Sequence, residues 1–154
     1  SRFCRIIINS KLRYTTTIRG IMDAKEILNP KWLLIGVGSL MFLAALSGVT
    51  DGQSWAETGW GKENVAEHDA EYEQMWALHL MPLAAMSVAT GLLVSGRALA
   101  QMAMAAAVSI AVFIGGGMLY LTSENGYGSG GFIYVLLFLT AIIGASGYLH
   151  RDDE

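Results

Sequence analysis

The 154-residue sequence contains a single cysteine, Cys4, and little charge. One cysteine cannot form an intramolecular disulfide, and it cannot supply a zinc or iron–sulfur site built from cysteine ligands. Charged residues make up 15% of the chain and hydrophobic residues 53%. Because a soluble domain of this length carries more charge, the composition argues against an ordinary soluble globular protein.

Sequence motifs of common catalytic and transport machinery are also missing. The sequence has no serine nucleophile elbow, phosphate-binding loop, His-Glu metalloprotease pattern or cysteine pair. Its long apolar runs carry no Lys, Arg, Asp or Glu, although pumps and ion-coupled transporters depend on such residues inside the membrane. No basic helix or finger occurs beyond the first twenty residues. These absences argue against an enzyme acting alone, an active transporter and a nucleic-acid-binding protein.

Four apolar stretches occupy most of the chain, at residues 32–49, 75–96, 99–121 and 132–149. A transmembrane helix needs about 20 predominantly apolar residues, and it satisfies its backbone hydrogen bonds within itself. We therefore predict an all-α fold, a four-transmembrane-helix bundle that forms a single integral membrane domain over residues 22–154. The predicted helices cover about residues 32–49, 64–96, 99–121 and 132–149, with the lipid bilayer as their surroundings.

The first 21 residues differ from the rest, because they are basic and contain no acidic residue before Asp23. They have two interpretations, an organelle transit peptide or an upstream segment translated by mistake ahead of a true start at Met22. We favour the second. From Met22 onward there are five basic and thirteen acidic residues, so the body of the protein is acidic.

The few basic residues of that body predict the topology. Lys25 and Lys31 precede the first span, Arg97 lies between the second and third, and Arg151 follows the fourth. All three places fall on one side of the bundle, and basic residues in short loops are retained in the cytoplasm. Both termini are therefore predicted to be cytoplasmic. The predicted location is a prokaryotic cytoplasmic membrane, or an organelle inner membrane if the basic leader is a transit peptide.

The opposite side receives residues 51–73, which hold seven acidic residues and one basic residue, Lys62. Residues 51–62 are rich in Gly and Trp and predict a loop. Asn64 and Glu67 have the spacing of a capping box, which predicts a helix that begins at residue 64 and continues into the membrane. The acidic residues of this segment are predicted to form a solvated face.

Six residues at helical spacing share one face of that second helix: His68, Tyr72, Met75, His79, Pro82 and Met86. His79, with Trp76 and Tyr72, is a candidate ligand or quinone site, and His68 with Glu71 is a candidate metal site. The alternatives are a hydrogen-bonded packing role for His79 and a solvated position for His68. The two histidines are about 16 Å apart along the helix, so they cannot share one metal ion. The sequence does not identify a cofactor.

The third span carries small residues at four-residue steps, namely Ala103, Ala107, Ala111 and Gly115. Small residues let helix backbones approach closely in membranes. This face has two interpretations, packing inside the four-helix bundle or a seam for self-association into an oligomer.

The layout of four short spans, a long first connection, a short basic turn and a Gly-rich turn extends over about residues 32–151. Together with the stretch Gly91-Leu-Leu-Val-Ser-Gly-Arg97, it resembles the DoxX-like group of small membrane proteins. Members of that group include subunits associated with quinone-linked oxidation. The resemblance therefore implies a possible redox partner and no particular catalytic residue.

Three functions follow as hypotheses. The first is a structural or accessory subunit, either a homo-oligomer or part of a larger membrane complex. The second is a redox or quinone-associated protein that uses His79. The third is a passive oligomeric pore.

Overall fold

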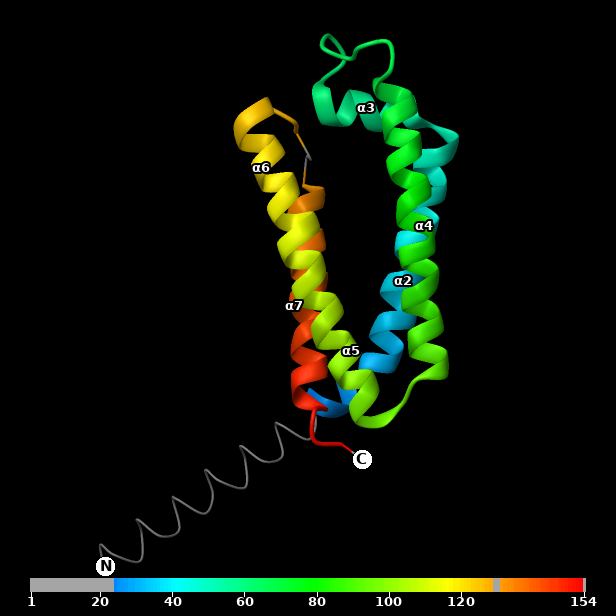
Figure 1. The fold of residues 1–154 in the computed structure, drawn as a ribbon, viewed down its shortest axis with the longest axis vertical. Coiled ribbons are helices and arrows are strands. Elements are labelled where there is room, and N and C mark those ends of the chain that lie inside the picture. Colours follow the sequence, from blue (N-terminus) through cyan, green and yellow to red (C-terminus); the bar gives the residue numbers. More distant parts are fainter. Residues whose placement is uncertain (1–23, 129–130, 154) are drawn as a thin grey trace, which may run out of the picture.

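The computed structural model describes residues 24–128 and 131–153, and the predicted leader, residues 1–21, lies outside them. The regular elements of the described residues are all helices, which confirms the all-α prediction (Figure 1). In chain order they are α2 (Pro30–Thr50), α3 (Gly52–Trp60), α4 (Asp69–Leu93), α5 (Gly96–Ser109), the π-helix η1 (Ile110–Gly115), α6 (Gly116–Asn125) and α7 (Phe132–Leu149).

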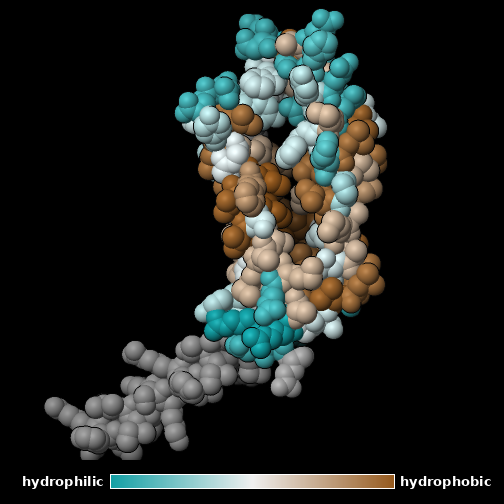
Figure 2. All heavy atoms as spheres, in the orientation of Figure 1, coloured by the Kyte–Doolittle hydropathy of each residue, from teal (hydrophilic) through white to brown (hydrophobic). Residues whose placement is uncertain are grey.

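Four helical stretches are long and apolar enough to cross a membrane: Ala24–Thr50, Asp69–Leu93, Gly96–Asn125 and Phe132–Leu149. Each of them contains or overlaps one of the four apolar runs of the sequence, and most of their ends lie within a few residues of the ends of those runs. Figure 2 shows apolar side chains around the middle of the molecule and hydrophilic side chains gathered at its two ends. Many large apolar side chains on the four helices are exposed. This distribution is typical of a membrane protein, in which apolar side chains face lipid.

The four long helices form two hairpins. One hairpin pairs α2 with α4, and the other pairs the continuous helix α5–η1–α6 with α7 (Figure 1). The hairpins join near the end of the molecule that carries the C terminus, here called the terminal end. A core cluster there unites α2, α5 and α7: Leu34, Leu99, Ala103, Ala107 and Ile143. Toward the opposite end, here called the α3 end, the hairpins diverge.

Glycine permits the close approach of α2 to α4. A Cβ atom at Gly38 would lie 2.9 Å from the carbonyl oxygen of Ala84, and one at Gly91 would lie 2.9 Å from that of Lys31. The Ser87 hydroxyl donates a hydrogen bond of 2.9 Å to the Leu34 carbonyl across the same interface. The backbones of this hairpin are therefore nearly in contact.

The predicted small-residue face of the third span packs inside the chain. Ala103 and Ala107 are buried, and Ala107 lies beside Gly144 of α7. Gly115 is buried beside Leu137, whereas Ala111 is half-buried. These contacts are those of packing within the chain, one of the two interpretations of this face. Self-association along it stays a prediction.

The segment predicted as a loop contains the helix α3, so that prediction is wrong. The Asp51 carboxylate accepts a hydrogen bond from the backbone N–H of Ser54 at 3.1 Å and caps the start of α3. Gly61, at a φ of 82°, ends it. Nine residues between two such caps are too few for a periodic apolar pattern to be visible in the sequence.

The predicted start of the second long helix is also wrong, because α4 begins at Asp69. The Asn64 side chain donates to the Trp60 carbonyl at 3.2 Å, and this contact removes it from the predicted capping box with Glu67. The Asp69 carboxylate instead accepts a hydrogen bond from the Ala66 N–H at 2.7 Å.

At the terminal end, Lys25 Nζ lies 2.7 Å from Asp153 Oδ1 and ties the two ends of the described chain together. The hydrogen bond from Lys25 lowers the pKa of Asp153 below its usual value. A carboxyl group with a lowered folded-state pKa stabilises the fold above its unfolded pKa, and this contribution is lost as pH falls through the folded pKa.

Acidification below about pH 4, the ordinary range of an aspartate, is therefore expected to remove a small stabilisation, at most about 1 kcal/mol for so exposed a pair. Unfolding of the detergent-solubilised protein by denaturant at several pH values measures it. Asp153→Asn should remove this part of the pH dependence, and an identical pH profile in that variant contradicts the assignment.

Candidate functional site

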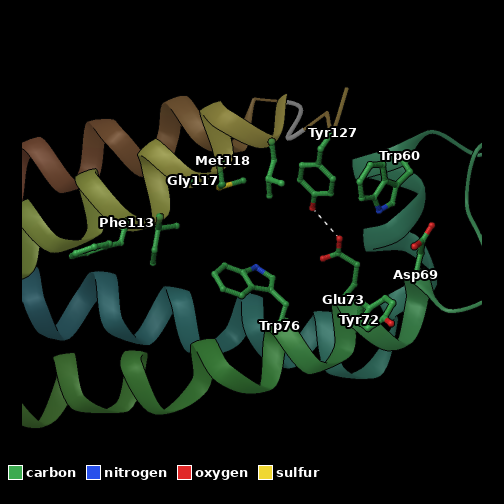
Figure 3. A pocket seen from close by; sticks show the side chains of 11 residues that line it. Trp60, Asp69, Tyr72, Glu73, Trp76, Phe113, Gly117, Met118 and Tyr127 are labelled. Atoms are coloured by element: carbon green, nitrogen blue, oxygen red, sulfur yellow. Dashed lines mark hydrogen bonds between the residues drawn. The ribbon is translucent and has the colours of Figure 1, made fainter. Parts of the chain in front are cut away.

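Two adjoining pockets lie between the hairpins at the α3 end, with volumes of about 460 and 330 Å³. Trp76, Met118 and Tyr127 line both of them. The larger pocket lies between α4 and the helix η1–α6 (Figure 3). The smaller one adds residues of α2, α3 and α7. The pockets therefore occupy the space that opens where the hairpins diverge.

A buried carboxylate stands at one end of the larger pocket. Glu73 belongs to α4 and is 7% exposed, on the helix side that also buries Ala77 and Leu80. The Tyr127 hydroxyl, from the connection after α6, donates a hydrogen bond of 3.0 Å to Glu73 Oε1 (Figure 3). The described residues donate no hydrogen bond to Glu73 Oε2, and this oxygen is not sealed from its surroundings, because no fully buried side-chain oxygen among them lacks a partner. One carboxylate oxygen is thus held by the protein and the other is available to a ligand.

Tyr127 remains a hydrogen-bond donor at any physiological pH. Burial raises the pKa of its phenol, and the charge of the neighbouring Glu73 and the hydrogen bond to it raise this pKa further. Ionisation of Tyr127 would place two negative charges side by side in a half-buried site. The phenol therefore keeps its proton and directs it at the carboxylate.

Contacts around Tyr127 join the two hairpins at the α3 end. The Trp60 ring packs edge-on against the Tyr127 ring with centroids 5.0 Å apart. The Gly128 N–H donates a hydrogen bond of 2.6 Å to the Gly59 carbonyl, and the Tyr127 ring fills the place that a Cβ atom at Gly59 would take. We call these five residues, Gly59, Trp60, Glu73, Tyr127 and Gly128, the clasp.

The lining of the larger pocket is aromatic, apolar and acidic. Besides Glu73, it includes the Asp69 carboxylate and the rings of Trp60, Tyr72, Trp76, Phe113 and Tyr127. Among the described residues, neither lining contains Lys, Arg or His. The ionisable carboxyl groups of the lining are therefore not matched by a basic side chain in it.

The three residues of the predicted ligand site lie in two different environments. Tyr72 and Trp76 line the larger pocket, and Trp76 lines both. His79 lines neither; it is exposed, with Nδ1 2.6 Å from the Met75 carbonyl oxygen of its own helix. The predicted helix face that includes it is the exposed side of α4.

The predicted metal pair, His68 and Glu71, lies at the exposed start of α4. His68 Nδ1 and Glu71 Oε2 are 3.6 Å apart, with side chains 68% and 78% exposed. Within residues 24–128 and 131–153, no group of three or more His, Cys, Asp or Glu side chains is placed to hold a metal ion. Two exposed ligands alone bind a metal weakly, because structural and catalytic sites use three or four.

Glu73, Trp60 and Tyr127 were not among the site residues predicted from the sequence. Glu73 was predicted to lie on a solvated face, and that prediction is wrong because the side chain is buried. A signal for Glu73 was present, since it lies four and seven residues before Ala77 and Leu80 on the buried side of the helix. No comparable signal marked Tyr127, which stands in a Gly-rich connection.

No family model, curated protein or solved structure matches this chain. The resemblance to DoxX-like proteins therefore stays a prediction, and the candidate site rests on its own geometry.

Proposed function

We propose that this protein binds an amphipathic small molecule taken up from the bilayer between its two hairpins. The observation that carries the proposal is the pair of adjoining apolar pockets with the Glu73–Tyr127 hydrogen bond at one end. Ligand sites in proteins are mostly apolar clefts of about 300–1,000 Å³ with a few polar groups that fix orientation. Both pockets fall within that range.

The arrangement of the lining supports an amphipathic ligand in one orientation. Phe113 and Met118 offer apolar surface to the body of the molecule, whereas the polar groups gather at the Asp69 and Tyr127 side of the pocket (Figure 3). Asp69 is the first residue of its candidate span, which corresponds to the polar boundary of a membrane. The head of a lipid-like molecule would lie at that boundary and its tail deeper.

Exposure of the pocket walls supports entry from the side. Phe113 is 78% exposed and Trp76 is 41% exposed, although both line the larger pocket. In a bilayer, an opening between helices at this height faces lipid tails. A membrane-soluble molecule could therefore enter without crossing water.

The distribution of charge supports an orientation with the α3 end outside the cytoplasm. Lys25 is paired with Asp153 at the terminal end, Arg151 follows α7, and Arg97 lies at the start of α5, which packs against the end of α7. The α3 end carries Lys62 near Glu57 among seven acidic residues, and basic residues favour the cytoplasmic side. This proposal develops the predicted ligand-binding hypothesis with Glu73 and Tyr127 in place of His79. The hypotheses of an accessory subunit and of an oligomeric pore stay predictions.

Filling the pocket tests the proposal. A Cβ atom at Gly117 meets no atom within 4 Å, although Gly117 lines the larger pocket. Gly117→Leu should therefore occupy the pocket without displacing a helix. Gly36, exposed on α2 and equally unobstructed, provides the control Gly36→Leu.

Native mass spectrometry of the full chain, extracted from its membrane in mild detergent, is the measurement. The unmodified protein and Gly36→Leu are expected to retain a small-molecule adduct that Gly117→Leu loses. Equal retention by Gly117→Leu, or a bare protein in all three samples, contradicts the proposal.

A further inference from the structure

The chemistry of the larger pocket identifies the class of ligand head that it suits. This inference rests on the proposed function and concerns the same site. Glu73 and Asp69 both line the pocket, and its lining includes no basic residue among those described. The basic side chains of the two hairpins lie elsewhere, with Lys25 paired to Asp153 at the terminal end. The positive charge that would balance Glu73 is not supplied by a neighbouring side chain.

An unbalanced buried carboxylate is costly. Glu73 is 7% exposed, and one phenolic hydrogen bond is its protein partner at 3.0 Å. Burial of a charged group is tolerated when the group is paired and hydrogen-bonded. A bound cation would pair it. An anionic head would instead add a third negative charge to those of Glu73 and Asp69.

The aromatic rings narrow the kind of cation. Trp60, Tyr72, Trp76 and Tyr127 stand around Glu73 in the larger pocket (Figure 3). A cation over the face of Trp or Tyr is attracted by the ring quadrupole, and rings of this kind form the cages that bind quaternary ammonium groups. A quaternary ammonium has no N–H donor and needs no hydrogen-bond acceptor, so ring faces and a carboxylate suffice to hold it. It therefore suits this lining, which is mainly aromatic and apolar.

We propose that the pocket binds the quaternary ammonium head of an amphipathic molecule, with Glu73 as its counter-ion, aromatic rings at its sides and its apolar tail between the hairpins. A free quaternary ammonium amphiphile and the choline head of a lipid share this chemistry. Besides Asp69 and Glu73, the segment 51–73 holds five more acids against one base, Lys62. It adds a negative surface at the same end of the molecule, and such a surface concentrates cations.

Three short-chain amphiphiles with the same tail separate the possibilities: octyltrimethylammonium, octylphosphocholine and octyl glucoside. Each is titrated into the full chain in dodecyl maltoside, and tryptophan fluorescence reports binding, since Trp60 and Trp76 line the pocket. Octyltrimethylammonium is expected to bind at least tenfold more tightly than octyl glucoside. Comparable binding of octylphosphocholine would identify a choline lipid as the source, and its failure to bind would identify a free cation.

Glu73→Gln keeps the size of the side chain and an acceptor for Tyr127 but removes the charge. It is expected to weaken octyltrimethylammonium binding about tenfold, as loss of a charge-assisted contact does, and to leave octyl glucoside binding unchanged. The matched control is Glu71→Gln, two residues away on the same helix, where the side chain is 78% exposed and outside the lining. Tyr72→Leu is a second variant, and it leaves the buried side chains unchanged because Tyr72 is 62% exposed. It should weaken binding of octyltrimethylammonium and leave binding of octyl glucoside unchanged.

Two results would overturn the inference in different ways. Equal binding of all three amphiphiles, unaffected by Glu73→Gln and Tyr72→Leu, would exclude a cation site and leave the proposed amphiphile binding intact. Binding of none of the three, together with no difference between Gly117→Leu and the unmodified protein, would exclude the proposed function as well.

Discussion

Gly38→Ala is expected to destabilise the protein by about 1–3 kcal/mol, the cost of overpacking a tight interface. The added methyl would lie 2.9 Å from the Ala84 carbonyl oxygen and 3.0 Å from Ser87 Cβ. Neither a backbone oxygen nor a Cβ atom moves without its helix, so α2 and α4 must separate. Separation would also lengthen the hydrogen bond from Ser87 to the Leu34 carbonyl.

The control is Gly36→Ala, two residues earlier on the same helix, where a Cβ atom meets nothing within 4 Å. This variant removes the flexibility of a helical glycine, and it should be neutral or stabilising by up to about 1 kcal/mol. Unfolding of both variants in mixed micelles, followed by circular dichroism, gives the two free energies. A loss of the same size in Gly36→Ala, or no loss in Gly38→Ala, would show that helix contact at Gly38 is not what matters.

Gly59→Ala is expected to open the clasp. Its methyl would occupy the place of the Tyr127 ring, which Trp60 confines from another side. The ring must then leave its position, and its hydroxyl leaves the Glu73 carboxylate. A buried acceptor that loses its donor costs about 1–3 kcal/mol, and more when it is charged.

Near-ultraviolet circular dichroism reports the Trp60–Tyr127 ring pair, and denaturant unfolding reports the free energy. Both should change in Gly59→Ala, and amphiphile binding should weaken with them. Gly131→Ala is the control, because Gly131 follows Tyr127 in the same connection and a Cβ atom there meets nothing within 4 Å. Unchanged spectra in Gly59→Ala would exclude the clasp as a rigid link between the hairpins.

Hydropathy predicted the four long helices because lipid-facing helices must be apolar along their whole length. The first predicted span, residues 32–49, compares with Pro30–Thr50 in the structure. Hydropathy could not predict the structure of the connection after this span. Whether Asn64 caps the following helix or bonds back to Trp60 depends on competition between two local contacts, and both are compatible with the sequence.

The candidate site was predicted in part. Tyr72 and Trp76 were predicted as companions of His79 in a ligand site, and both line the larger pocket. The partner of Glu73 could not be predicted, because Tyr127 lies 54 residues away in a connection without periodicity. His79 was predicted because histidine can bind ligands and metals and transfer protons, but it lies on the exposed side of α4. The helical spacing that places Glu73 on the same side of α4 as Ala77 would have predicted that Glu73 is buried.

The π-helix Ile110–Gly115 sets the rotational phase between two halves of one helix. Before it, Ala107 is buried beside α7; after it, Gly117 and Met118 face the larger pocket. A π turn holds one more residue than an α turn, so it absorbs one residue without turning the helix that follows it. Deletion of one residue within Ile110–Gly115 would therefore restore α-helical bonding and keep Gly117 and Met118 on the pocket side, whereas the same deletion within α5 would rotate the helix beyond it by about 100°. The composition of the pocket wall thus depends on where in this long helix a residue is gained or lost.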